Sequence, residues 1–329
     1  MRSTPKVVRA LAVVGALAVA LAGCSSQGGA NSANNNSGPA VGSAGGKQYT
    51  IAMVTHEAPG DSFWDKIRAG AQQAAKELNV NLKYSNNNDA GQQATLVQNA
   101  IDSKVDGLAV TLAYADQVGP AAQKAVEAKI PTVAFNSGIS EYQKYGIGMY
   151  FGSDETLAGQ SAGKKMTAGG KALCVIQEQG SVALEARCAG VKATYPNTEN
   201  LQVTGTDIAS VQQTIGAKLQ QDPSITYVVT LGAPIALAAL QAAQGASSKA
   251  KIVTFDLNAD VANDIKAGTI EFSIDQQPYV QGYMAVQALW LNLTNGNDLG
   301  GGKPVLTGPS FVDKSNIDAI ATYAANNTR

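Results

Sequence analysis

A short unit of strand, loop and helix recurs along this chain, and it constrains the possible folds more than any other sequence feature. The unit is clearest at residues 49–78, where an apolar, β-prone run precedes a Gly/Pro/Asp loop. A helix is expected to open at Asp61 or Ser62, since Ser62 and Asp65 have the spacing of a capping box. Such a helix has to lie back over a sheet. In open α/β sheets, ligands bind at the carboxyl ends of the strands, so we expect a site in residues 56–64.

The same alternation continues to residue 166, and it restarts at Lys171. Its apolar runs are short and continuous, as in parallel strands buried on both faces. The expected strands after the first are 82–84, 107–112, 132–136, 145–152, 172–177, 201–205, 226–231, 251–256 and 271–274. A long helix (279–293) and a short terminal segment (304–312) follow. The sequence therefore predicts an α/β protein with two doubly wound parallel-sheet lobes and a cleft between them.

The first residues have the features of an export signal. A basic start (Arg2, Lys6, Arg9) precedes an apolar core at 11–21, and the run Leu-Ala-Gly-Cys ends at Cys24. This ending resembles the lipobox of bacterial lipoproteins, which implies cleavage after residue 23 and lipidation of Cys24. The alternative is an ordinary secretory signal with a chance cysteine. Residues 24–46 are then expected to form a flexible Ser/Gly/Asn-rich tether.

Composition excludes several classes of function. The chain has 24 Lys+Arg against 25 Asp+Glu, and without a basic stripe it has no electrostatic footprint for nucleic acid. There is one histidine, His56, and no Cys-x-x-Cys pair, so we expect neither a metal site nor a cofactor. No second long apolar run exists, which leaves the N-terminal lipid as the only expected membrane contact.

Two cysteines remain in the exported part of the chain. Cys174 falls in an expected strand and Cys188 in the helix that packs back over it. An even number of cysteines in an oxidising compartment favours a disulfide between them, and two buried free thiols are the alternative.

Polar side chains that can bind a sugar occur at the expected strand and helix ends. Planar carboxylates, amides and guanidinium groups engage adjacent hydroxyls, and an aromatic ring stacks on the C–H face. The polar candidates are Asp61, Asn136, Arg187, Asp256 and Gln276. Each alone is more simply interpreted as a helix cap, a solvated amide or a surface charge. Their occurrence at five expected strand or helix ends favours a binding site instead. Phe63 and Trp64 are the aromatic candidates, and Trp64 is preferred for stacking.

His56 has two interpretations. It reads as a hydrogen-bonding histidine at the rim of the site or, in an enzyme, as a general base.

Residues 49–312 resemble the ribose-binding type of periplasmic sugar-binding proteins of ABC transporters. Asp-Ser-Phe-Trp (61–64) stands where that family has Asn-Pro-Phe-Phe, and Asn136-Ser137 stands where it has Asp-Arg. Arg187, Asp256 and Gln276 fall at the family's Arg-x-x-Gly, Gly-Phe-Asp and hinge motifs.

The resemblance implies lobes that exchange strands at three hinge crossings, near Gly152, 274–277 and 306–309. One lobe would comprise 47–152 plus 278–306, and the other 153–277 plus 307–329.

The resemblance also implies a function. We expect an extracytoplasmic lipoprotein, monomeric and not an enzyme, that delivers an uncharged monosaccharide or polyol to an ABC permease. The alternative is a receptor that presents a sugar-like signal, of the autoinducer type, to a sensor. Asn136-Ser137 and Gly232 remove polar groups that hold ribose in the family, while Asp61 and Asp275 add acceptors. Ribose should therefore bind weakly, and an acyclic polyol or a hexose should fit better.

Overall fold

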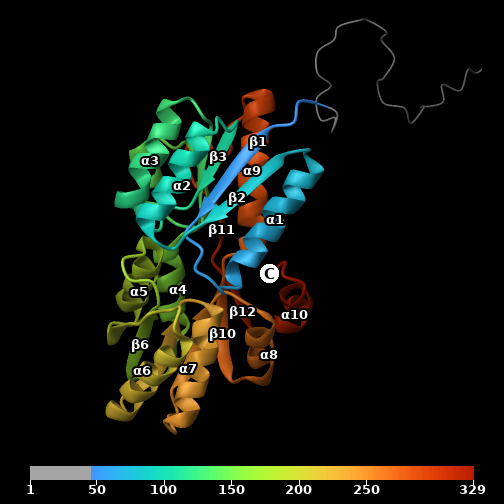
Figure 1. Ribbon diagram of the computed structural model, residues 1–329. Helices are drawn as coiled ribbons and strands as arrows, with labels where there is room; N and C mark the ends of the chain where they lie inside the picture. The colour runs from blue at the N-terminus through green and yellow to red at the C-terminus, as the bar shows by residue number, and fades with distance from the viewer. Residues whose placement is uncertain (1–45) are drawn as a thin grey trace, which may run out of the picture. The chain divides into compact units, whose positions relative to one another are not determined.

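The computed structural model describes residues 46–329. The signal segment and Cys24 lie outside the described residues. The described residues belong to one compact unit, which contains two six-stranded sheets, each covered by helices on both faces (Figure 1). The predicted α/β fold class with two parallel-sheet lobes is confirmed.

The sheet of the first lobe has the order β11-β5-β4-β3-β1-β2, and all its neighbouring strands are parallel. Its strands are β1 (Thr50–Thr55), β2 (Asn81–Asn86), β3 (Gly107–Val110), β4 (Thr132–Phe135), β5 (Met149–Ser153) and β11 (Val305–Gly308). Helices α1 (Phe63–Glu77) and α9 (Pro278–Asn295) pack on one face. Helices α2 (Ala90–Asp102) and α3 (Ala115–Glu127) pack on the other, next to the 3-10 helix η1 (Tyr142–Tyr145).

The sheet of the second lobe has the matching order β12-β10-β9-β8-β6-β7, in which only β12 is antiparallel to its neighbour. Its strands are β6 (Lys171–Ile176), β7 (Thr198–Gln202), β8 (Ile225–Thr230), β9 (Lys251–Phe255), β10 (Ile270–Asp275) and β12 (Ser310–Asp313). Helices α4 (Glu155–Lys165) and α5 (Val182–Thr194) cover one face. The other face carries α6 (Ile208–Gln221), α7 (Ala233–Gly245), α8 (Ala259–Ala267) and α10 (Ile317–Ala325).

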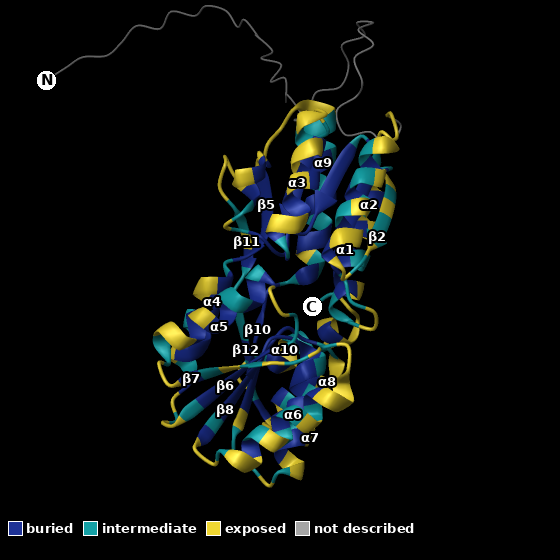
Figure 2. Cartoon of the chain, turned by 60° about the vertical axis from the view of Figure 1, so that its left-hand side comes forward, coloured by how far each residue is buried: buried dark blue, intermediate teal, exposed yellow. Residues whose placement is uncertain are grey.

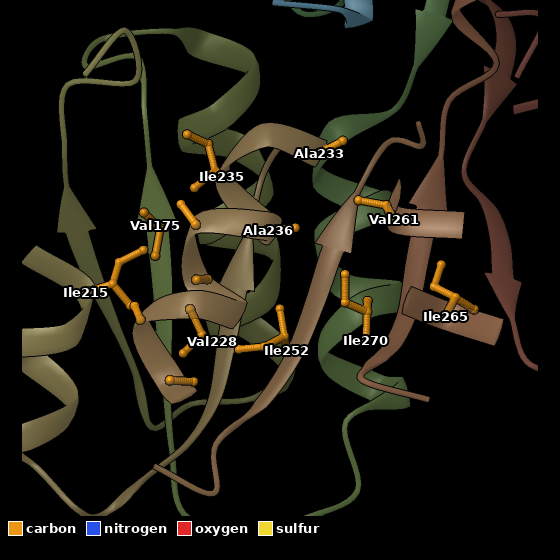
Figure 3. Close-up of a cluster of buried hydrophobic side chains, with 14 of the residues drawn as sticks. Val175, Ile215, Val228, Ala233, Ile235, Ala236, Ile252, Val261, Ile265 and Ile270 are labelled. Atoms are coloured by element: carbon orange, nitrogen blue, oxygen red, sulfur yellow. The ribbon is translucent and has the colours of Figure 1, made fainter. Parts of the chain in front are cut away.

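The cores explain why the strands read as unbroken apolar runs in the sequence. Figure 2 shows the central strands largely buried and most of the exposed residues on the outer faces of the helices and in loops. In the second lobe, Val228 and Ile252 from the sheet belong to one cluster with Ile215, Ala236 and Val261 from the helices (Figure 3). Strands covered on both faces need apolar side chains in both directions, which removes the usual alternation.

The strand order places a ligand site. In the first lobe the chain runs from β1 to β2 on one side and then crosses to β3 on the other, so the order reverses between β1 and β3. In the second lobe it reverses in the same way between β6 and β8. Doubly wound sheets bind ligands outside the carboxyl ends of the strands at such reversals. Each lobe is therefore expected to contribute the carboxyl ends of its strands at this reversal to a ligand site.

Several local predictions differ from the structure. Tyr145 was expected in a strand but ends η1, where Gly146 adopts a left-handed φ of 74° and the tyrosine side chain packs into the core. The predicted capping box is wrong, because Ser62 has helical angles and makes no side-chain cap. Asp61 Oδ1 instead accepts a hydrogen bond from Phe63 N at 3.0 Å. Helix α10 was not predicted.

The predicted disulfide is confirmed. Cys174 in β6 and Cys188 in α5 are bonded, with their Cα atoms 5.9 Å apart and both residues fully buried. The bond ties the strand to the helix that carries Arg187. No helix within residues 46–329 is long and apolar enough to cross a membrane.

Candidate functional site

A cavity of about 530 Å³ lies at the carboxyl ends of the strands and takes its lining from both lobes. His56, Asp61, Tyr114 and Asn136 line it from the first lobe. Glu178, Arg187, Leu231 and Asp256 line it from the second, and Gln276 lines it from the segment that joins β10 to α9. The volume is within the range of small-molecule sites, which combine apolar walls with a few convergent polar groups.

The loop after β1 is held by a cluster centred on Glu57. Arg68 donates two hydrogen bonds to the Glu57 carboxylate, at 2.6 and 2.7 Å, and the Tyr84 hydroxyl donates a third at 2.7 Å. The Arg68 guanidinium also lies over the Tyr84 ring, 4.6 Å from its centroid. Bidentate arginine–carboxylate pairs fix geometry as well as charge. This cluster therefore fixes the position of the loop that carries His56 and Asp61.

His56 is held in one tautomer by Thr111. The Thr111 hydroxyl oxygen accepts from His56 N at 3.1 Å and from Gln93 Nε2 at 3.1 Å, and it lies 2.7 Å from His56 Nδ1. The Gln93 amide is oriented by a second bond to the Thr111 carbonyl oxygen, at 2.9 Å. A hydroxyl has two acceptor sites and one proton, so the Thr111 proton goes to Nδ1. His56 therefore carries its hydrogen on Nε2.

The three residues at the start of α1 behave differently from one another. Asp61 lines the cavity, and burial raises the pKa of its carboxyl. Trp64 also lines the cavity, but it is only 2 % exposed, packs into the core and meets the His56 ring edge-on, with centroids 4.7 Å apart. Phe63 lines the same cavity and is less buried than Trp64. Stacking of either ring on a ligand remains a prediction.

Asn136 and Asp256 stand at equivalent strand ends in the two lobes, directly after β4 and β9, and are bridged by Gln276. Asn136 Nδ2 donates to Gln276 Oε1 at 3.3 Å, and Gln276 Nε2 donates to Asp256 Oδ1 at 2.9 Å. Gln281 of α9 supports the bridge, since its Oε1 accepts from Asn136 at 3.2 Å and its Nε2 donates to Gln276 Oε1 at 2.9 Å. The bridge connects both halves of the cavity through the segment that joins β10 to α9.

Arg187 lies on the second-lobe side of the cavity as a buried cation. Its Nε donates to Glu155 Oε2 at 2.5 Å, and its Nη1 donates to the Leu231 carbonyl oxygen at 3.1 Å. The guanidinium lies over the Phe255 ring, 4.6 Å from its centroid. Nη1 is also 3.8 Å from Asp256 Oδ2. Burial raises the pKa of the Asp256 carboxyl to about 7, although the charge of Arg187 opposes this rise.

Two predicted site residues do not line the cavity. Ser137, the residue after Asn136, is fully buried, and so is Asp275, the last residue of β10. The Asp275 carboxylate accepts from Arg329 Nε at 2.7 Å and from Gln277 N at 2.9 Å. Its acceptors are therefore used within the protein, and the expected extra acceptor at this position is absent from the cavity.

Sequence reasoning missed Glu178 and Glu155. Glu178 follows β6 and lines the cavity, where burial and the nearby charge of Asp61 raise the pKa of its carboxyl to about 7. The rule that polar residues at strand ends form the site applies to it equally and would have identified it. Glu155 starts a helix in the sequence, and nothing there shows that it is buried against Arg187. In the described residues, no group of His, Cys, Asp and Glu side chains is arranged to hold a metal ion.

Two doubly wound lobes with a polar cavity between their strand ends define a class of protein: a two-lobed receptor for a small polar solute. The family model "Periplasmic binding protein domain" matches residues 51–298. The chain belongs to this family, and within it to the ribose-binding type of sugar-binding proteins that serve ABC transporters. It is thus an extracytoplasmic binding component and not an enzyme.

Individual relatives agree with this assignment. A crystal structure of a carbohydrate transporter from Acidothermus cellulolyticus in complex with myo-inositol is 54% identical, has a TM-score of 0.85, and covers 86% of this chain and 100% of its own. The xylose/arabinose-binding protein of Sulfolobus acidocaldarius is 23% identical over 82% of this chain and 72% of its own. The ribose import binding protein of Haemophilus influenzae is 24% identical over 76% and 87%.

Proposed function

We propose that this protein captures an uncharged polyol, with myo-inositol as the leading candidate, and delivers it to the permease of an ABC transporter. The observation that carries the proposal is the 54% identity to a carbohydrate transporter in complex with myo-inositol, over 86% of this chain. The sequence alone favoured an acyclic polyol or a hexose, and this similarity shifts the proposal to a cyclic polyol.

The chemistry of the cavity supports a ligand with many hydroxyls. Asp61, Glu178 and Asp256 offer carboxylate acceptors, while Arg187 and the Nε2–H of His56 offer donors. Each hydroxyl of a polyol is donor and acceptor at once, so such a ligand can satisfy both kinds of group. The ring of Phe63 supplies an apolar surface for its C–H face.

We propose that capture works by closure of the lobes. The chain passes between the two sheets at three places, after β5, after β10 and between β11 and β12. These places support hinge-joined lobes of 47–152 plus 278–306 and 153–277 plus 307–329. A ligand that contacts residues of both lobes binds the closed state better than the open one, and it therefore shifts the population toward closure.

We also propose that Cys24 is lipidated and anchors the protein to the outer face of the membrane, because residues 21–24 form a lipobox. Intact-mass analysis of the mature protein from its native host should show an acylated Cys24 as the first residue. An unmodified, freely soluble mature protein would refute the anchor and leave the ligand proposal standing.

A thermal-shift screen tests the ligand proposal. The panel should contain inositols, pentoses, hexoses, pentitols and hexitols, added to the mature chain. A ligand present at 100 times its dissociation constant stabilises the folded state by about 2.7 kcal/mol. We expect the largest shift from an inositol. A panel in which only a pentose raises the melting temperature would reject the cyclic-polyol assignment.

A further inference from the structure

Glu178 and His56 face each other across the cavity from opposite lobes. Glu178 follows β6 in the second lobe, His56 follows β1 in the first, and both line the cavity. His56 Nε2 lies 3.8 Å from Glu178 Oε2, which is too long for a hydrogen bond. Burial lowers the pKa of His56 to about 3, so the imidazole is neutral and the contact is not an ion pair.

The two facing atoms have complementary roles. The Thr111 hydroxyl gives its proton to His56 Nδ1, which leaves an Nε2–H that points out of this network as a donor. The Glu178 carboxylate is an acceptor, and within residues 46–329 no side chain within hydrogen-bond distance donates to it. A donor and an unpaired acceptor 3.8 Å apart leave room for one oxygen atom about 2.8 Å from each.

We propose that Glu178 is a specificity-determining ligand residue that, together with His56, binds one hydroxyl group of the polyol. The hydroxyl oxygen accepts from His56 Nε2–H, and the hydroxyl proton is donated to Glu178 Oε2. This inference rests on the proposed function, since it names the group of the polyol that one part of the site recognises. The contact joins the lobes, so it forms only in the closed state.

The proposed contact selects for a hydroxyl at one ring position. A ring carbon without oxygen can neither accept from His56 nor donate to Glu178. A protonated amino group can donate to Glu178 and Asp61 but has no lone pair for the Nε2–H of His56. The deoxy analogue therefore leaves both partners unsatisfied and the amino analogue leaves His56 unsatisfied, in a cavity where the carboxyl groups are already largely buried.

The experiment combines one protein variant with a set of ligand analogues. Calorimetry compares wild-type mature protein, Glu178→Ala and the control Glu185→Ala, using myo-inositol and its monodeoxy analogues. Glu185 is a glutamate of the following helix α5 and does not line the cavity. Glu178→Ala should bind myo-inositol roughly ten- to a hundredfold more weakly, and Glu185→Ala should match wild type.

The analogues separate direct contact from an indirect structural effect. One monodeoxy analogue should bind wild type as weakly as myo-inositol binds Glu178→Ala, and the variant should no longer distinguish that analogue from myo-inositol. Equal losses for every analogue in both proteins, or unchanged affinity in Glu178→Ala, would overturn this inference and leave the proposed function standing. Tighter binding of an amino analogue than of myo-inositol would also overturn it, in favour of an ammonium site. Failure of wild type to bind any member of the wider polyol panel would reject the proposed function, and this inference with it.

Discussion

Asn136 and Asp256 share the same backbone conformation at equivalent positions of the two lobes, with left-handed φ angles of 65° and 66°. Both residues directly follow a parallel strand, and their side chains are joined through Gln276. Asn and Asp tolerate this conformation better than other residues with a side chain. The turn therefore directs a polar group into the cavity from each lobe, and Gln276 ties the two groups to the segment between β10 and α9.

Loss of the Asp256 carboxylate should weaken ligand binding strongly. Asp256→Ala removes a buried acceptor of the cavity and leaves Gln276 Nε2 without its partner. An unpaired buried polar group costs about 1–3 kcal/mol, so we expect roughly a ten- to hundredfold loss of affinity for the polyol by calorimetry. Asp260→Ala, at an exposed position of α8, is the control. Equal affinity of both variants would remove Asp256 from the site.

The tautomer of His56 can be observed directly, because it is the only histidine in the chain. In untagged protein, imidazole nitrogen NMR should show a protonated Nε2 and an unprotonated Nδ1. Since burial lowers the pKa of His56 to about 3, the spectrum should not change between pH 7.5 and about 5.

Thr111→Val removes the proton that Nδ1 accepts and should alter the spectrum. Thr95→Val, at an exposed position of α2, should not. A titration near pH 6.5 in the wild-type protein would contradict the assigned network.

The largely buried carboxyl of Glu178 should make stability depend on pH. The folded-state pKa of about 7 lies above the value of about 4.3 for an unperturbed glutamate. Between these values the folded state keeps a proton that the unfolded state has lost, so this group's contribution to stability falls as pH rises from about 4 to about 7. Glu178→Gln removes the titration. In ligand-free protein, its gain in melting temperature over wild type should therefore be larger at pH 8 than at pH 4.5.

An exposed glutamate supplies the control for this measurement. Glu127→Gln, at the exposed end of α3, is the matched substitution, and its effect on melting temperature is subtracted from that of Glu178→Gln at each pH. A gain from Glu178→Gln that is the same at both pH values would show that the carboxyl is not perturbed in the folded protein.

The sequence predicted the fold and most of the cavity from local patterns. Continuous apolar runs identified the strands, and the residues after them gave Asp61, Asn136, Asp256 and Gln276. The sequence-based prediction failed for residues whose role depends on contacts with distant parts of the chain. Asp275 also ends a strand, but only the folded chain brings Arg329 to its carboxylate. Glu155 occupies an ordinary helix start, and its burial depends on the approach of α5, which no local pattern encodes.

The close approach of α4 to α5 positions Arg187 and should be sensitive to one methyl group. A Cβ on Gly159 would collide with the Arg187 carbonyl, so Gly159→Ala has to push the helices apart. We expect a loss of about 1–3 kcal/mol in the free energy of unfolding, together with weaker ligand binding. At Gly216 of α6 the nearest atom to an added Cβ is 3.8 Å away, so Gly216→Ala should be neutral or stabilising by about 0.5–1 kcal/mol. Urea unfolding of both variants measures the difference in their free energies of unfolding. Equal stabilities would show that α4 and α5 can accommodate a methyl group at Gly159.

The central claim is that the cavity selects a polyol over the pentose bound by the family's ribose-binding members. Isothermal titration calorimetry of ligand-free wild-type protein with myo-inositol and with ribose tests it most directly. Asn136-Ser137 and Gly232 replace polar groups that hold ribose in that family, while Asp61 and Glu178 offer acceptors to additional hydroxyls. We predict that myo-inositol binds at least roughly tenfold more tightly than ribose. Tighter binding of ribose, or no heat of binding with myo-inositol, would contradict the account.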